Sequence, residues 1–181
     1  EVDEGEIWYD DQKFSHMDGP SRQKIRKEMG MLFQGAALFD SLTVEENVLF
    51  PLDMFTAQSR SEKLDRVNFC LERVRVAKTN TLYPAELSGG MKKRVAIARA
   101  IALNSRYLFC DEPNSGLDPE TGIVIDQLIK DLRSDGFELD DQGDVNDFFC
   151  VIATTDENSR EIRMNEKCLI NSILEDLCLL S

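Results

Sequence analysis

Two adjacent carboxylates, Asp111 and Glu112, end the short apolar run "RYLFCDEP". The length and apolar character of this run predict a strand buried on both faces of a parallel sheet. Ligands bind beyond the carboxyl ends of such strands, so an acidic pair there is well placed for chemistry. One carboxylate would hold Mg²⁺, directly or through water, and the other would orient and deprotonate an attacking water. The alternative is a polar strand end without a catalytic role.

A second candidate site is "LSGGM", residues 87–91, at the start of a predicted helix. It supplies Ser88, Gly89 and Gly90. The backbone N–H groups and the positive dipole end of a helix start can hold a phosphate, and glycines let it approach. The alternative is a loop with an ordinary Ser cap. The phosphate-binding pattern G-x-x-x-x-G-K-[ST] does not occur in the sequence.

The elements that would position these residues alternate between strand and helix, which predicts an α/β domain. Thr43 and Glu46 form a capping-box pattern at one helix start. Apolar residues at three- and four-residue spacing predict further amphipathic helices. The predicted strands are "GEIWYDD", "MGMLFQ", "RYLFCDEP" and "FFCVIA", with "MGMLFQ" expected to be buried. The predicted helices are "GPSRQKIRKE", "LTVEENVLFPL", "SRSEKLDRVNFCLERVRV" (Leu64, Val67, Leu71, Val74), "LSGGMKKRVAIARAIAL" and the segment around Ile125, Leu128, Ile129 and Leu132.

Composition limits the class of protein. The 181 residues, 42% hydrophobic and 30% charged, indicate one ordinary soluble globular domain. A net charge of −13 argues against direct nucleic-acid binding, although "RQKIRKEMG" and "KKR" are small basic segments. Five scattered Cys, no C-x-x-C pair and one His argue against a zinc site and predict reduced, mostly buried thiols in a cytosolic protein. No apolar run approaches the roughly 18 residues of a membrane span, so a membrane role would be peripheral.

Four motifs together strongly resemble the ATP-binding cassette (ABC) ATPases. Leu87–Met91 match the signature motif, Tyr107–Glu112 the Walker B strand, Ser115–Asp118 the D-loop and Gln34 the Q-loop. The phrases "MLFQGAALFDSLTVEENV" and "ELSGGMKKRVAIARAIA" are most similar to the ATPase subunit of Mla-type phospholipid-transport systems of Gram-negative bacteria. The resemblance is good over residues 5–132 and poor after residue 134.

The resemblance implies a P-loop NTPase-like α/β sheet with a helical signature subdomain, lacking the N-terminal strand and the Walker A loop. The whole chain, 1–181, would be a partial nucleotide-binding domain. The helical subdomain would lie within about 35–105, the Walker B core within 106–156, and a divergent tail at 157–181. Because the family places the Walker A loop just upstream of residue 1, an N-terminal truncation is the plainest explanation of its absence.

The resemblance also assigns roles in the hydrolysis of ATP with Mg²⁺. Asp111 would position Mg²⁺, and Glu112 would be the general base on the attacking water. Gln34 would contact the metal or the water and sense the γ-phosphate. Asp118 would bridge the two sites of a dimer.

The same resemblance implies partners. Ser88, Gly89 and Gly90 would contact ATP bound to a second ATPase subunit in a head-to-tail dimer. Residues 37–55 would meet the coupling helix of a membrane permease; an internally packed helical subdomain is the equal alternative. The phospholipid would be handled by the complex rather than by this chain, no nucleic acid is expected, and the location would be the cytoplasmic face of the bacterial inner membrane.

Three departures from the family pattern keep other functions open. Walker A is missing, Thr155 stands where the family has a switch His, and the tail from Glu157 does not follow the family. That tail would be a diverged packing helix, a partner-binding helix or the end of a disrupted reading frame; the lone His16 is expected to be exposed and without a catalytic role. The main alternative to an ATPase subunit is a non-catalytic, truncated cassette that pairs with an intact one. A head domain of a DNA-repair protein fits less well, because the chain is acidic and has no coiled-coil heptads.

Overall fold

The computed structural model describes residues 8–9, 12–14, 17–134 and 149–153, with backbone alone for 8–13, 133–134 and 149–153. The chain divides into two compact units, of which the second spans Lys27–Arg163. In the first unit a two-stranded antiparallel hairpin precedes a helix that begins beside Asp18, whose carboxylate accepts the backbone N–H of Ser21 at 2.9 Å. These elements are β1 (Trp8–Tyr9), β2 (Gln12–Lys13) and α1 (Gly19–Lys27). The strand and the helix predicted for this region are confirmed.

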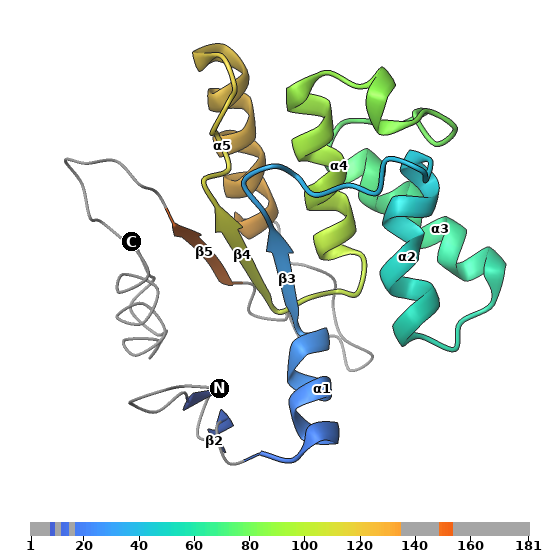
Figure 1. The fold of residues 1–181 in the computed structure, drawn as a ribbon, viewed down its shortest axis with the longest axis vertical. Coiled ribbons are helices and arrows are strands. Elements are labelled where there is room, and N and C mark those ends of the chain that lie inside the picture. Colours follow the sequence, from blue (N-terminus) through green and yellow to red (C-terminus); the bar gives the residue numbers. More distant parts are fainter. Residues whose placement is uncertain (1–7, 10–11, 15–16, 135–148, 154–181) are drawn as a thin grey trace. The chain divides into compact units, whose positions relative to one another are not determined.

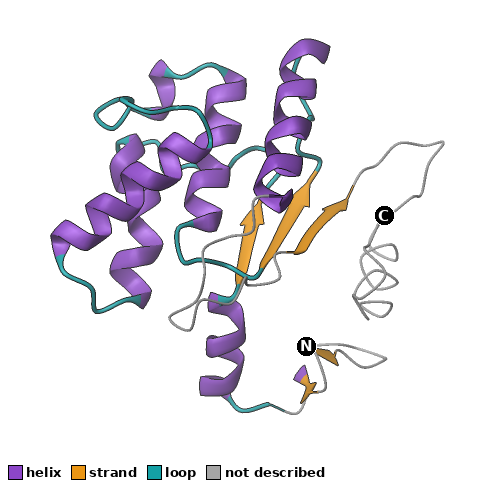
Figure 2. Ribbon diagram, turned by 180° about the vertical axis from the view of Figure 1, so that it is seen from behind, coloured by secondary structure: helices purple, strands orange, loops and turns teal. Residues whose placement is uncertain are grey.

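The second unit is built on a three-stranded parallel sheet of order β3-β4-β5 (Figures 1 and 2). The register pairs Leu32 with Cys110 on one side of β4 and Asp111 with Ala153 on the other. The strands are β3 (Met29–Leu32), β4 (Tyr107–Asp111) and β5 (Phe149–Ala153). Because all three run the same way, their carboxyl ends meet at one edge, as expected for the α/β class.

Helices follow the strands in the second unit. The α2, α3 and α4 helices pack against one another, and α4 also lies on β3 (Figure 1). The α5 helix contacts α4 and β5. The bounds are α2 (Val44–Phe55), α3 (Arg60–Arg73), a short 3₁₀ helix η2 (Pro84–Glu86), α4 (Gly89–Ile101) and α5 (Pro119–Ser134).

Local hydrogen bonds define where α2 and α3 begin. Thr43 and Glu46 form the predicted capping box, in which Thr43 Oγ1 accepts the N–H of Glu46 and the Glu46 carboxylate accepts the N–H of Thr43 at 2.8 Å. Ser59 and Glu62 repeat the arrangement at α3, although the sequence interpretation overlooked this second box. Each box satisfies backbone donors that a helix start leaves without partners.

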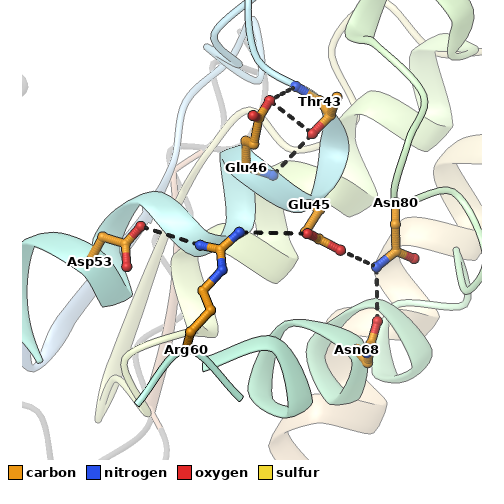
Figure 3. Close-up of polar contacts among 7 residues, drawn as sticks. All are labelled: Thr43, Glu45, Glu46, Asp53, Arg60, Asn68 and Asn80. Carbon is orange, nitrogen blue, oxygen red and sulfur yellow. Dashed lines mark hydrogen bonds and ion pairs between the residues drawn. The ribbon is translucent and has the colours of Figure 1, made fainter. Parts of the chain in front are cut away.

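Polar side chains connect α2, α3 and the loop that precedes η2 (Figure 3). The Arg60 guanidinium lies 3.9 Å from the Glu45 carboxylate and 3.8 Å from that of Asp53. The Asn80 amide donates to Glu45 at 3.0 Å and to the Asn68 side chain at 2.8 Å. Since the Arg60 side chain is 59% exposed, these ion pairs contribute little to stability, and apolar packing holds the two helices together.

The core confirms the predicted helix faces. All four apolar residues assigned to the buried face of α5 are at most 3% exposed. In α3 and at its end, Val67, Leu71 and Val74 are buried, and Leu64 is half-buried. Gly30 of β3 allows α4 to approach closely, because a Cβ there would lie 2.3 Å from the carbonyl oxygen of Ala100.

One prediction of burial is wrong. The segment "MGMLFQ" was expected to be a buried strand, yet Met31 and Phe33 are 48% and 46% exposed. Only the face of β3 that carries Gly30 and Leu32 packs against α4. Met31 alternates with Gly30 and Leu32 along β3 and so lies on the opposite face, where its side chain is exposed, and Phe33 follows the end of the strand.

The other sequence predictions are tested in part. Cys70 and Cys110 are buried free thiols, as predicted. His16, Thr155, the acidic loop and the tail from Glu157 lie outside the described residues. The domain limits near residues 35, 105 and 156 stay predictions. Among the described residues, no helix is long and apolar enough to cross a membrane.

Candidate functional site

The acidic pair lies at the carboxyl edge of the sheet. Asp111 is the last residue of β4 and is exposed, and Glu112 follows it. Glu112 has a φ of 42°, in the left-handed region that residues with a Cβ rarely adopt. Its carbonyl oxygen accepts the N–H of Ser115, which closes the turn after the strand. The backbone therefore turns sharply at the residue predicted to act as the base.

Gln34 meets this pair from the neighbouring strand. It lies two residues after the end of β3, and β3 runs parallel to β4 (Figure 1). Its Nε2 donates to Glu112 Oε2 at 2.6 Å and to Ser115 Oγ at 3.2 Å. The fold thus brings together two residues 78 positions apart, both assigned to the site by resemblance.

The loop after Gln34 is held by two basic residues of α4. Lys93 Nζ donates to the carbonyl oxygen of Gln34 and, at 3.2 Å, to that of Glu112. The Arg99 guanidinium donates to the carbonyl oxygens of Ala37 at 2.8 Å and of Ala36 at 3.1 Å. Both alanines have positive φ, 63° at Ala36 and 49° at Ala37, a conformation that needs support from its surroundings.

The signature residues form the start of α4. Ser88 is the N-cap, and its Oγ accepts the N–H of Met91 at 3.3 Å. Ser88 and Gly89 are exposed, whereas Gly90 is buried against α5, where a Cβ would lie 2.4 Å from Thr121 Cγ2. The structure leaves these residues at a separate helix start rather than joining them to the Gln34–Glu112 contact. An exposed helix start with two glycines can receive an anion from outside the chain.

Asp118 stands before α5 and is exposed. Its carboxylate accepts the hydroxyl of Thr121 at 2.6 Å and the N–H of Thr121 at 3.0 Å. The side-chain hydrogen bond and then the backbone hydrogen bond from Thr121 lower the pKa of Asp118. In this chain Asp118 therefore begins a helix; its bridging of two subunits stays a prediction.

Sequence reasoning missed Lys93, Arg99 and Asn47. The buried Asn47 side chain organises the loop before α2 by bonding both backbone groups of Phe39. A signal for Lys93 did exist, since it occupies the buried stripe of α4 at three- and four-residue spacing. That stripe consists of Gly90, Lys93, Ile97 and Ile101. A lysine in such a stripe needs a polar partner.

The residues at this edge fit a part of a Mg²⁺–nucleotide site. Carboxylate and amide oxygens such as those of Asp111 and Gln34 suit Mg²⁺, which is usually held by one or two carboxylates together with substrate phosphates. Within the described ranges, no group of three or more His, Cys, Asp or Glu side chains gathers into a metal site by itself.

Solved structures define the class of fold. The chain aligns with an ATP-binding cassette solved as a dimer in a post-hydrolysis state bound to ADP and Pi, with a TM-score of 0.68 and 34% identity over 86% of this chain and 65% of that one. It also aligns with cbiO1 from Clostridium perfringens, part of the ABC transporter complex cbiONQ, with a TM-score of 0.69 and 26% identity over 85% of this chain and 57% of that one. The protein has the ABC ATPase cassette fold.

Sequence comparison then gives the family. The profile described as "ABC transporter" matches residues 1–115, and the chain belongs to this family. The methionine import ATP-binding protein MetN 1 of Pseudomonas fluorescens is 41% identical over 71% of this chain and 38% of its own length. MetN of Thermobifida fusca is 43% identical over 72% of this chain and 40% of its own length. The chain thus spans about two fifths of the length of the curated relatives it matches.

Proposed function

We propose that this chain carries the hydrolytic part of the ATP-binding subunit of an ABC transporter. The observation that supports it is the 2.6 Å hydrogen bond from Gln34 to the Glu112 carboxylate at the carboxyl edge of a parallel sheet. That contact joins an amide that can sense a ligand to an acid that can accept a proton. Family membership supports ATP as the nucleotide.

The proposed chemistry follows from the residues present. Glu112 would orient a water and accept its proton as the water attacks the terminal phosphate of ATP. Gln34 would keep the Glu112 carboxylate in place, and Asp111 would hold Mg²⁺ together with Gln34. Mg²⁺, when bound, neutralises phosphate charge. The helix start at Ser88 would receive the terminal phosphate of ATP bound to a second subunit, consistent with the dimeric form of the related cassette.

A permease would contact residues 37–55. The Phe39, Phe50 and Met54 side chains there are 42%, 39% and 60% exposed, and the first two rings lie 4.8 Å apart. The opposite face of α2 is buried in the core, through Val48 and Leu52 among others. An interface and a packed subdomain are therefore compatible on the two faces of one helix. A chain bound in this way would be peripheral at the inner face of the bacterial inner membrane.

Two candidate substrates remain for the transporter. The sequences around the Q-loop and the signature motif are similar to phospholipid-transport ATPases and favour phospholipid as the substrate. The relatives named above are methionine import proteins. We would purify the native polypeptide with its permease and reconstitute the complex. Stimulation of ATP hydrolysis by methionine, with no response to lipid composition, would exclude the phospholipid proposal; the converse result would exclude methionine.

Turnover by the native polypeptide tests the catalytic proposal. We expect Glu112→Gln to lower kcat for Mg-ATP by about a hundredfold or more, since general-base catalysis contributes on this scale. Glu120→Gln, at an exposed acid in the first turn of α5, is the matched control and should leave kcat unchanged. If the native polypeptide does not hydrolyse ATP but pairs with an intact cassette, the non-catalytic alternative replaces this proposal.

A further inference from the structure

Lys93 is a buried charge with an unusual set of partners. Its residue is 4% exposed, and Nζ donates to two main-chain carbonyl oxygens, those of Gln34 and Glu112. Lys63, at 9% exposed, offers a contrast within the same unit, because it pairs with the Asp53 carboxylate at 2.9 Å. A buried ammonium needs strong acceptors, and Lys93 takes them from the backbones of the two residues that form the site.

These bonds close a ring at the site. Lys93 joins the main chains of Gln34 and Glu112, and the side chains of the same two residues hydrogen-bond to each other. Glu112 has a left-handed φ of 42°, a conformation that residues with a Cβ rarely adopt. Such a conformation persists only where neighbouring groups hold it. Lys93 provides one of those contacts, and the N–H of Ser115 provides another.

The ring also includes a residue of α4, the helix that begins after the signature residue Ser88. Lys93 stands five residues after the N-cap Ser88 on α4. The helix itself is closely seated, since Gly30 and Gly90 leave no room for a Cβ between α4 and its neighbours. A shift of α4 relative to β3 and β4 would therefore move Nζ against both carbonyl oxygens.

We propose that Lys93 is a positioning residue that sets the Glu112 carboxylate against the Gln34 amide and makes this geometry depend on the position of α4. The proposal rests on the proposed hydrolytic function for its kinetic consequence, whereas the placement of Gln34 by Lys93 can be tested without ATP. Burial lowers the pKa of Lys93, and the charges of Asp111 and Glu112 oppose that shift.

The first test is kinetic and uses the native polypeptide. Lys93→Met removes the donor but keeps the length of the side chain. We expect kcat for Mg-ATP to fall by about ten- to a hundredfold while KM changes less than about twofold, since small misplacements of reacting groups have effects of this size. Lys93→Arg keeps N–H donors for the two carbonyl oxygens, so its kcat should lie clearly closer to that of the wild type than the kcat of Lys93→Met.

Lys63→Met is the control for the loss of a buried lysine. It removes a nearly buried charge and its ion pair from α3, away from the ring, and should leave kcat unchanged even if it lowers the melting temperature. A Lys93→Met variant with the same kcat as Lys63→Met would overturn the proposal. So would a Lys93→Arg variant as impaired as Lys93→Met.

The second test is spectroscopic and uses the 181-residue chain. With ¹⁵N-labelled glutamine, the side-chain amide signal of Gln34 is assigned by its loss in Gln34→Glu. Lys93→Met should move this signal toward the position of a water-exposed amide, whereas Lys63→Met should leave it in place. An unmoved signal in Lys93→Met refutes the positioning role. If the wild-type native polypeptide has no ATP turnover, the proposed function fails, and this signal alone decides the role of Lys93.

Discussion

Replacing Asn47 with alanine tests how the loop between Gln34 and α2 is held. Asn47 is fully buried in the first turns of α2. Its Oδ1 accepts the N–H of Phe39 at 2.8 Å, and its Nδ2 donates to the carbonyl oxygens of Phe39, Leu42 and Thr43 at 2.9–3.1 Å. The loop carries Phe39 of the proposed permease surface, so its shape bears on function as well as on stability.

The magnitude follows from counting the groups that lose their partner. The Phe39 carbonyl still accepts the N–H of Leu42, and the Thr43 carbonyl still accepts the backbone N–H of residue 47. The Phe39 N–H and the Leu42 carbonyl lose the partner that Asn47 supplied. At about 1–2 kcal/mol for each such group, we expect Asn47→Ala to lower the free energy of unfolding by about 2–4 kcal/mol. The lower value applies if water reaches Phe39, which is 42% exposed.

Urea unfolding, followed by far-UV circular dichroism, measures the loss. The midpoint should fall while the slope m stays unchanged, which would show that stability rather than compactness has changed. Asn80→Ala is the matched control, because the Asn80 amide bonds the side chains of Glu45 and Asn68, where water can replace it (Figure 3). We expect a loss below about 1 kcal/mol for the control. An Asn47→Ala variant no less stable than Asn80→Ala would refute the reasoning.

Two further predictions concern packing and pH. Gly30→Ala would place a Cβ 2.3 Å from the Ala100 carbonyl oxygen and should cost about 1–3 kcal/mol or more in urea unfolding, whereas Gly35→Ala, with open space around it, should cost far less; equal losses would contradict the packing argument. Hydrogen bonds from Ser59, first from its side chain and then from its backbone, lower the pKa of Glu62 below its ordinary value of 4.5. The folded state thus favours the ionised Glu62 carboxylate. The stabilisation from these hydrogen bonds is complete above pH 4.5 and is lost as the pH falls through the lowered pKa of Glu62. Ser59→Ala should therefore destabilise the chain more at pH 7 than near pH 4, and a loss independent of pH would contradict this.

Local elements were largely predictable because their causes lie within a few residues. The Thr43–Glu46 capping box is a contact over three positions, and the buried face of α5 follows from spacing within one helix. The second box at Ser59 and Glu62 was missed, although it obeys the same rule. The site residues were assigned through the resemblance to a family, and the acidic pair at a strand end also had an independent physical reason.

The errors and omissions concern packing between distant segments. The sequence of β3 reads as apolar on both faces, and only the packing of α4 against the face of Gly30 and Leu32 shows that Met31 lies on the exposed face. The spacing of α4 places Lys93 in a buried stripe, yet no local pattern identifies the acceptors of its charge. Those acceptors lie 59 and 19 positions away in the chain.

By itself the sequence determined the helices, the capping box at Thr43, the strand that ends at Asp111 just before Glu112, and the family to which the chain belongs. The tertiary structure decided that Gln34 contacts Glu112 and that Lys93 holds the backbones of both. The physical reason is range. Caps and helix faces depend on hydrogen bonds and spacing within one or two turns, whereas the Gln34–Glu112 contact depends on the parallel register of β3 and β4 and on how closely Gly30 lets α4 approach.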